Sequence, residues 1–138
     1  MEPQRIQFTQ DSLCQWAGMG DFLLVSPDGE HTLELRYEGE PPHGDSYHKA
    51  RIDGRAYPGS VWGCMFAFSL CSRYLAFSAM PKRFERATAV VDLQTHRHFV
   101  LPAYIYQFKL CWPLVIGEGN LSSGQTYRFE GTEQWLAY

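Results

Sequence analysis

The stretch FSLCSRYLAFSAM, residues 68–80, decides the fold. Two apolar runs flank a central group of turn residues, and two more apolar runs, TAVVDL and RHFVL, follow at residues 88–101. Short runs of aromatic and β-branched residues bounded by turn residues are typical of strands. Because the connections are too short for crossovers, consecutive strands are expected to pair antiparallel. Residues 66–101 therefore predict a unit of four antiparallel strands.

The same plan recurs on both sides of this stretch. LLVSPDGEHTLELRYEG and YHKARIDGRAYPG precede it within residues 22–60, and YQFKLCWPLVIGEG and QTYRFEGTEQWLAY follow within residues 104–138. The matching anchors Ser26, Ser69 and Leu110 are 43 and 41 residues apart. This spacing is close to the period of about 40–45 residues that is typical of four-stranded propeller blades.

On this evidence, residues 22–138 resemble blades of the β-propeller superfamily, of the SPDG…LAF…DL kind. The resemblance implies an all-β antiparallel meander of three blade-like repeats, a partial propeller. Its two terminal faces would be open, because a closed ring is what protects blade faces and edges. A β-sandwich or barrel is the alternative, since evenly spaced hairpins also build those folds.

The chain is expected to be a single domain of 138 residues, with residues 1–21 as an N-terminal capping segment. Within that segment, the apolar side chains of Ile6, Phe8, Leu13 and Trp16 would cover one open face. The other face would be covered by a partner protein or by a second copy of the chain.

Composition limits the function classes. The chain is 45% hydrophobic and 20% charged, with a formal net charge of −3, which argues against a nucleic-acid partner because phosphate contacts need clustered Lys and Arg. The N-terminus has no apolar signal core, and no run reaches the roughly 18 apolar residues of a membrane span. The four cysteines form no CxxC pair. These features predict a cytoplasmic protein with no membrane partner.

No motif predicts catalysis. His96 and His98 lie two residues apart, a spacing that can hold zinc, yet no further ligands follow nearby, and we interpret them as part of a polar strand edge. Cys71 and Cys111 occupy matching repeat positions, which favours repeated packing over two nucleophiles. GEGNLSSG lacks the Lys-Ser/Thr ending of a phosphate loop. The sequence therefore predicts no enzyme activity, no cofactor and no metal site.

Two surface features remain as candidate partner-binding sites. The first is an acidic strip, expected to steer and dock a basic partner; the second is the loop MPKRFERAT, whose exposed aromatic among cations is typical of an interface anchor. The strip comprises Glu34, Glu38, Glu40 and Asp45 and runs into Tyr47, and the loop carries Lys82, Arg83 and Arg86 around Phe84. The alternatives are a solvated strand face for the strip and, for the loop, a Phe84 that folds back on the core.

In size, mild acidity, aromatic content and lack of a secretion signal, the chain is similar in general character to the cytosolic immunity proteins made against polymorphic bacterial toxins. The similarity implies stoichiometric capture of a toxin enzyme with a basic surface, by occlusion of its active site. The alternative is a structural or assembly subunit that pairs through open sheet edges, which also leaves a homodimer open. A third hypothesis is a small-ligand binder or enzyme with a pocket between blades.

Overall fold

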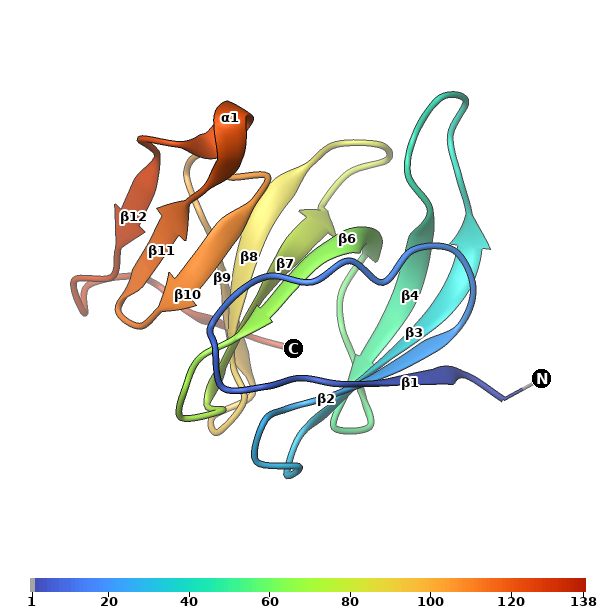
Figure 1. Ribbon diagram of the computed structural model, residues 1–138, viewed down its shortest axis with the longest axis horizontal. Coiled ribbons are helices and arrows are strands. Elements are labelled where there is room, and N and C mark those ends of the chain that lie inside the picture. Colours follow the sequence, from blue (N-terminus) through green and yellow to red (C-terminus); the bar gives the residue numbers. More distant parts are fainter. Residues whose placement is uncertain (1) are drawn as a thin grey trace.

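The computed structural model describes residues 2–138, which form thirteen strands and one four-residue helix (Figure 1). The elements in chain order are β1 (Gln4–Gln7), β2 (Phe22–Val25), β3 (Thr32–Gly39), β4 (Tyr47–Ile52), β5 (Arg55–Ala56), β6 (Ser60–Phe68), β7 (Tyr74–Met80), β8 (Ala87–Asp92), β9 (Arg97–Val100), β10 (Phe108–Cys111), β11 (Leu114–Gly117), α1 (Gly119–Ser122), β12 (Thr126–Arg128) and β13 (Leu136–Ala137). The prediction of an all-β protein is confirmed. No helix within residues 2–138 is long and apolar enough to cross a membrane.

The strands form a ten-stranded sheet and a three-stranded sheet. The large sheet has the order β1-β2-β3-β4-β6-β7-β8-β9-β13, with β5 added beside β4, and the small sheet has the order β10-β11-β12. Neighbouring strands pair antiparallel except β1 and β2, which are parallel. The strands described in residues 2–138 do not close into a barrel.

The large sheet is nearly divided between β4 and β6, which pair only at Tyr47 with Trp62 and at His48 with Val61. On one side of this junction lie β2, β3 and β4, and on the other lie β6, β7, β8 and β9, with the small sheet beyond them (Figure 1). The chain is thus arranged in three layers. The middle layer is covered on both faces, because one hydrophobic cluster joins it to the first layer and another joins it to the small sheet.

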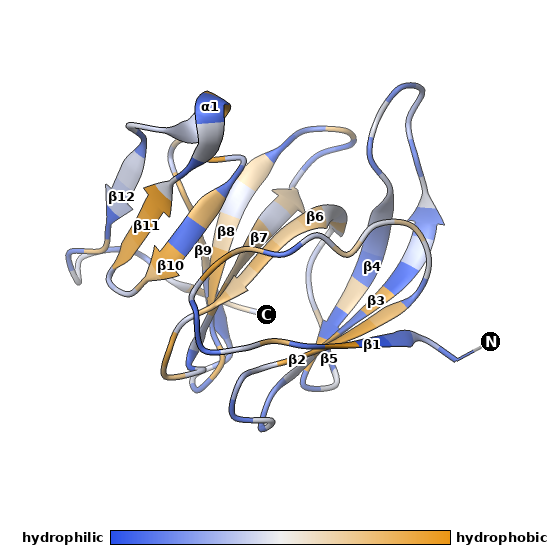
Figure 2. Cartoon of the chain, viewed as in Figure 1, coloured by the Kyte–Doolittle hydropathy of each residue, from blue (hydrophilic) through white to orange (hydrophobic). Residues whose placement is uncertain are grey.

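This layering explains why residues 68–80 lack a clear alternation of apolar and polar residues. All seven residues of β7 are buried. Leu75 and Phe77 point into the cluster shared with the first layer, and Tyr74 and Ala76 into the cluster shared with the small sheet. In contrast, β3 and β4 alternate between hydrophobic and hydrophilic residues because only one of their faces is buried (Figure 2).

The N-terminal segment follows a different course from the expected cap. Phe8 is buried in the core, and Ile6 packs against it, whereas Leu13 and Trp16 stay 44% and 49% exposed. Residues 8–21 instead run across the other elements, as the blue ribbon of Figure 1 shows. Their backbone forms hydrogen bonds with Gly63 and Phe66 of β6 and with Leu110 of β10. The segment is therefore held by backbone pairing, which no apolar pattern in the sequence reveals.

Two hairpin turns, between β2 and β3 and between β6 and β7, share three hydrogen bonds. The hydroxyl of Ser26 accepts from the amide of His31 at 3.1 Å, and that of Ser69 accepts from the amide of Tyr74 at 3.0 Å. The amide of Ser26 donates to the carbonyl of His31, and the amide of Ser69 donates to the carbonyl of Tyr74, both at 2.9 Å. The amides of Gly29 and Ser72 donate to the carbonyls of Ser26 and Ser69, also at 2.9 Å. Ser26 and Ser69, two of the three aligned anchors, therefore build similar turns.

Candidate protein-binding site

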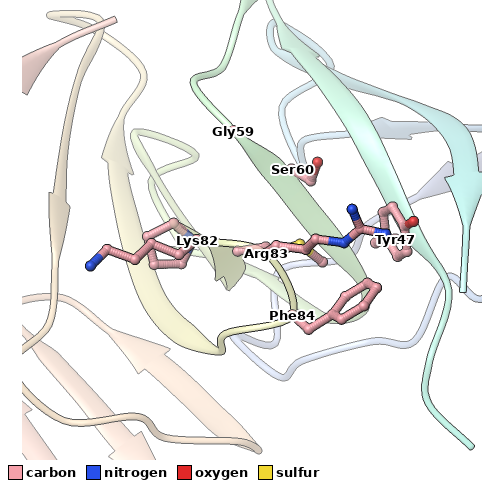
Figure 3. Close-up of a pocket in the computed structure, with 8 residues that line it drawn as sticks. Tyr47, Gly59, Ser60, Lys82, Arg83 and Phe84 are labelled. Atoms are coloured by element: carbon pink, nitrogen blue, oxygen red, sulfur yellow. The ribbon is translucent and has the colours of Figure 1, made fainter. Parts of the chain in front are cut away.

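Two hairpin loops protrude from the same end of the molecule (Figure 1). One is the β3–β4 loop, residues 40–46, and the other, residues 81–86 between β7 and β8, is called the Phe84 loop. A pocket of about 370 Å³ lies at the Phe84 loop (Figure 3). It is lined by Tyr47, Gly59, Ser60, Met80, Pro81, Lys82, Arg83 and Phe84. Tyr47, at one end of the expected acidic strip, thus lines the same pocket as the cationic loop.

Contacts of Arg86 fix the Phe84 loop to the first layer. Its guanidinium Nη2 lies 2.8 Å from Asp45 Oδ2, and its central carbon lies 3.9 Å from the ring centroid of Trp62. The indole of Trp62 donates in turn to the carbonyl of Glu85 at 2.9 Å. An ion pair, a cation–π contact and a hydrogen bond therefore hold the base of the loop.

Phe84 is presented at the surface by the loop and does not return to the core. Its side chain is 41% exposed and its φ is 63°, a left-handed conformation that costs a bulky residue free energy. The edge of its ring meets Tyr47, with 5.9 Å between centroids, and Arg83 lies 5.0 Å from its centroid. The ring is therefore oriented by its neighbours while remaining accessible, as an interface anchor must be.

The acids of the expected strip are mostly paired with cations of the chain itself. Glu34 accepts from Arg36 Nε at 3.1 Å, and Glu38 accepts from Ser60 Oγ at 2.7 Å and lies 4.0 Å from Lys49 Nζ. Asp45 is bound to Arg86, as described above, whereas Glu40 is exposed in the β3–β4 loop. The strip therefore does not form one continuous band of unpaired negative charge.

The structure brings only part of the predicted set together. Tyr47 lines the pocket with Lys82, Arg83 and Phe84, Glu38 reaches its edge through Ser60, and Asp45 holds Arg86. Glu34 lies near the start of β3, opposite Arg51, whereas Tyr47 pairs with Gly39 at the other end of this strand pair. It belongs to the polar face of the first layer.

Sequence reasoning missed the buried residues that support the loop. Trp62 is 1% exposed and Cys64 is fully buried, and both contact Arg86. Burial, with a smaller contribution from the nearby Asp45 carboxylate, raises the pKa of the Cys64 thiol to about 12. Both residues precede the predicted unit of residues 66–101, and nothing in the sequence indicates the loop that they meet.

The histidines and the other cysteines lie elsewhere. His98 Nδ1 is 2.8 Å from the hydroxyl of Tyr57, and His96 lies in the turn before β9 with a φ of 56°. Cys71 is exposed and Cys111 is partly exposed. In residues 2–138, no group of three or more His, Cys, Asp or Glu side chains is arranged to hold a metal ion.

Comparisons of the chain with models of protein families, with curated proteins and with solved structures find no match.

Proposed function

We propose that the protein is a protein-binding module whose contact surface is centred on the Phe84 loop. The observation that carries this proposal is an exposed aromatic side chain on a loop fixed by Arg86, Asp45 and Trp62. Pre-ordered aromatic and arginine side chains are enriched among the residues that dominate binding energy, since little conformational entropy is lost when they dock. Binding by such a loop needs no catalytic residue and no cofactor.

The function that we propose for this surface is that of a cytoplasmic immunity protein, which neutralises a toxin enzyme by occluding its active site. A protruding loop with an aromatic tip is suited to entering a concave site, and the adjoining β3–β4 loop would cover its rim. Glu40 and the edge carboxylate of Glu38 would face basic groups of the toxin. Complementary charges of this kind speed association and fix orientation more than they add affinity.

We also propose that the three layers are blade-like units of a partial propeller. The face-to-face layers, the repeat spacing of 43 residues between Ser26 and Ser69, and the matching hydrogen bonds of their turns support this interpretation. In this arrangement the outer faces of the first layer and of the small sheet would correspond to the open ends of an incomplete ring.

A second candidate function, that of an assembly subunit, is favoured by the positions of the outermost strands. The large sheet ends at β1 on one side and at β13 on the other, and the small sheet ends at β12. Within residues 2–138, the outer edges of β1 and β13 pair with no further strand, and unpaired edges are templates for pairing with another chain. Edge pairing between copies would produce a homodimer.

Affinity purification of the tagged protein from the cells that produce it tests the two proposals against each other. The immunity proposal expects one enzyme, recovered at a one-to-one ratio and inactive while bound. It also expects a toxin-like reading frame immediately upstream. Self-association, or recovery of a multi-subunit assembly that remains when Phe84 is replaced by alanine, would instead support edge pairing. Capture of an enzyme that stays fully active would overturn occlusion.

A further inference from the structure

We infer that the pocket beside Phe84 receives a short acidic segment of the partner protein, one that presents a carboxylate next to an apolar side chain. This inference rests on the proposed function as a protein-binding module and specifies the chemistry of the bound segment. It differs from the sequence expectation, in which basic groups of the partner dominated the contact.

Lys82 and Arg83 are exposed and line the pocket, and no carboxylate of residues 2–138 lies within 4.0 Å of either side-chain nitrogen group. The acids of the site are engaged elsewhere, since Asp45 binds Arg86 and Glu38 binds Ser60 and lies near Lys49. Figure 3 shows the guanidinium of Arg83 beside Tyr47 and Phe84, whereas the side chain of Lys82 extends to the opposite side. The pocket therefore presents Arg83 to an incoming group, with the positive charge of Lys82 at its rim, and a carboxylate is the natural counterpart of these cations.

The pocket also has an apolar lining. The rings of Phe84 and Tyr47 lie on the same side as the guanidinium of Arg83 (Figure 3), and Met80 and Pro81 line the pocket with them. Its volume of about 370 Å³ is near the lower end of the range of about 300–1,000 Å³ found for ligand pockets. A carboxylate alone would leave this lining uncovered, whereas an adjacent apolar side chain would bury it.

Gly59 forms part of the wall of the pocket. It has a φ of 74°, and a Cβ there would lie 3.0 Å from the carbonyl oxygen of Met80, so glycine lets the chain pack closely against its own backbone at this point. The cations together with the apolar lining fit a stretch of peptide better than a small ion.

Titration of the isotope-labelled protein by NMR with three capped dipeptides tests the inference. The probes are acetyl-Asp-Phe-amide, acetyl-Asn-Phe-amide and acetyl-Lys-Phe-amide. We expect the Asp peptide to shift the amide signals of Ser60, Lys82 and Phe84 at millimolar concentration, and to bind at least about threefold more tightly than the other two. The difference should shrink as salt is added.

Charge reversal supplies the matched control. The double variant Lys82→Glu, Arg83→Glu should lose the preference for the Asp peptide and gain one for the Lys peptide. The variant Arg5→Glu, Arg128→Glu, with the same net charge but changes on β1 and β12, should behave as the wild type. Equal binding of the Asp and Lys peptides to the wild type, or shifts confined to other residues, would overturn the inference. If an enzyme is captured through Phe84 but the protein binds the three peptides equally well, only the inference is refuted. If the protein prefers the Asp peptide but captures no enzyme, only the proposed function is refuted.

Discussion

Arg86 and Asp45, on different hairpins and 41 residues apart in the chain, form an ion pair of 2.8 Å at the base of the Phe84 loop. Their side chains are 30% and 27% exposed, so water screens the pair only in part. The guanidinium also covers the ring of Trp62. This single cation therefore connects the loop that displays Phe84 to the first layer of the fold.

Replacing Arg86 by alanine should lower the free energy of unfolding by about 1–2 kcal/mol, because both the ion pair and the cation–π contact are lost. Urea denaturation followed by tryptophan fluorescence measures this change. In a double-mutant cycle with Asp45→Asn, the two losses should not add, which isolates the coupling between the side chains. Arg83→Ala, at an exposed cation of the same loop, should change stability by less than about 0.5 kcal/mol. Strict additivity in the cycle would refute the ion pair as a stabilising contact.

The four cysteines should differ widely in their reaction with a disulfide reagent such as DTNB. Cys71 is exposed and should react first. Cys64 is fully buried, and a pKa of about 12 leaves only about one thiol in 10⁴ ionised at pH 8, so it should react only after unfolding. The Cys71→Ala variant should lose the fast phase. Labelling of Cys64 in the native protein at the rate of Cys71 would contradict the packing around Trp62.

His48 should make the protein less stable in mild acid. It is fully buried, with Nε2 2.9 Å from the carbonyl of Gly20, and burial lowers its pKa in the folded protein. The unfolded chain therefore binds a proton that the folded chain does not. The stabilisation is complete above the unfolded pKa of about 6.5 and is lost as the pH falls below it, by at most about 1.4 kcal/mol per pH unit.

The variant His48→Gln keeps a donor for Gly20 but does not titrate, so its loss of stability between pH 7 and pH 5 should be smaller than that of the wild type. Denaturation curves at a series of pH values give the comparison. Burial also lowers the pKa of His98, but this residue is present in both proteins. Its contribution therefore cancels when the pH profile of the variant is subtracted from that of the wild type. Identical pH profiles for the two proteins would show that His48 is not buried in the neutral form.

The serines of the two matching turns should each contribute to stability. Ser26→Ala and Ser69→Ala each remove the acceptor of a backbone amide, that of His31 and that of Tyr74, and each should cost about 1 kcal/mol. Ser123→Ala, at an exposed residue after α1, should cost less than about 0.5 kcal/mol. Thermal unfolding of the three variants provides the test. A large loss at only one of the two turn serines would contradict their structural equivalence.

Much of the fold follows from local patterns in the sequence. The alternation of Leu33 and Leu35 with polar residues is the pattern of a strand with one buried face, and the mostly apolar residues before Met80 correspond to a strand buried on both faces. The pairing of β4 with β6 and the backbone bonds of the N-terminal segment could not be predicted, because a backbone hydrogen bond leaves no mark on the side-chain pattern.

For the candidate site, composition identified the Phe84 loop and the acids but not their relation. The sequence does not reveal that Asp45 meets Arg86, since their contact depends on how two hairpins lie in space. That contact pairs Asp45 with a cation, and Arg36 and Lys49 lie beside Glu34 and Glu38 in the same way. The acidic docking strip stays a prediction, and three of its four acids lie next to a cation of the chain in the folded protein.

Partner capture through Phe84 is tested most directly by native mass spectrometry of the complex purified from the producing cells, with the wild type and with Phe84→Ala. We predict a one-to-one complex with an inactive enzyme for the wild type. We expect the variant to keep its fold and to bind that enzyme at least about 30-fold more weakly, the loss typical of a dominant interface residue. Equal affinity of the two proteins for the same partner, or only self-associated chains in both spectra, would contradict the proposal.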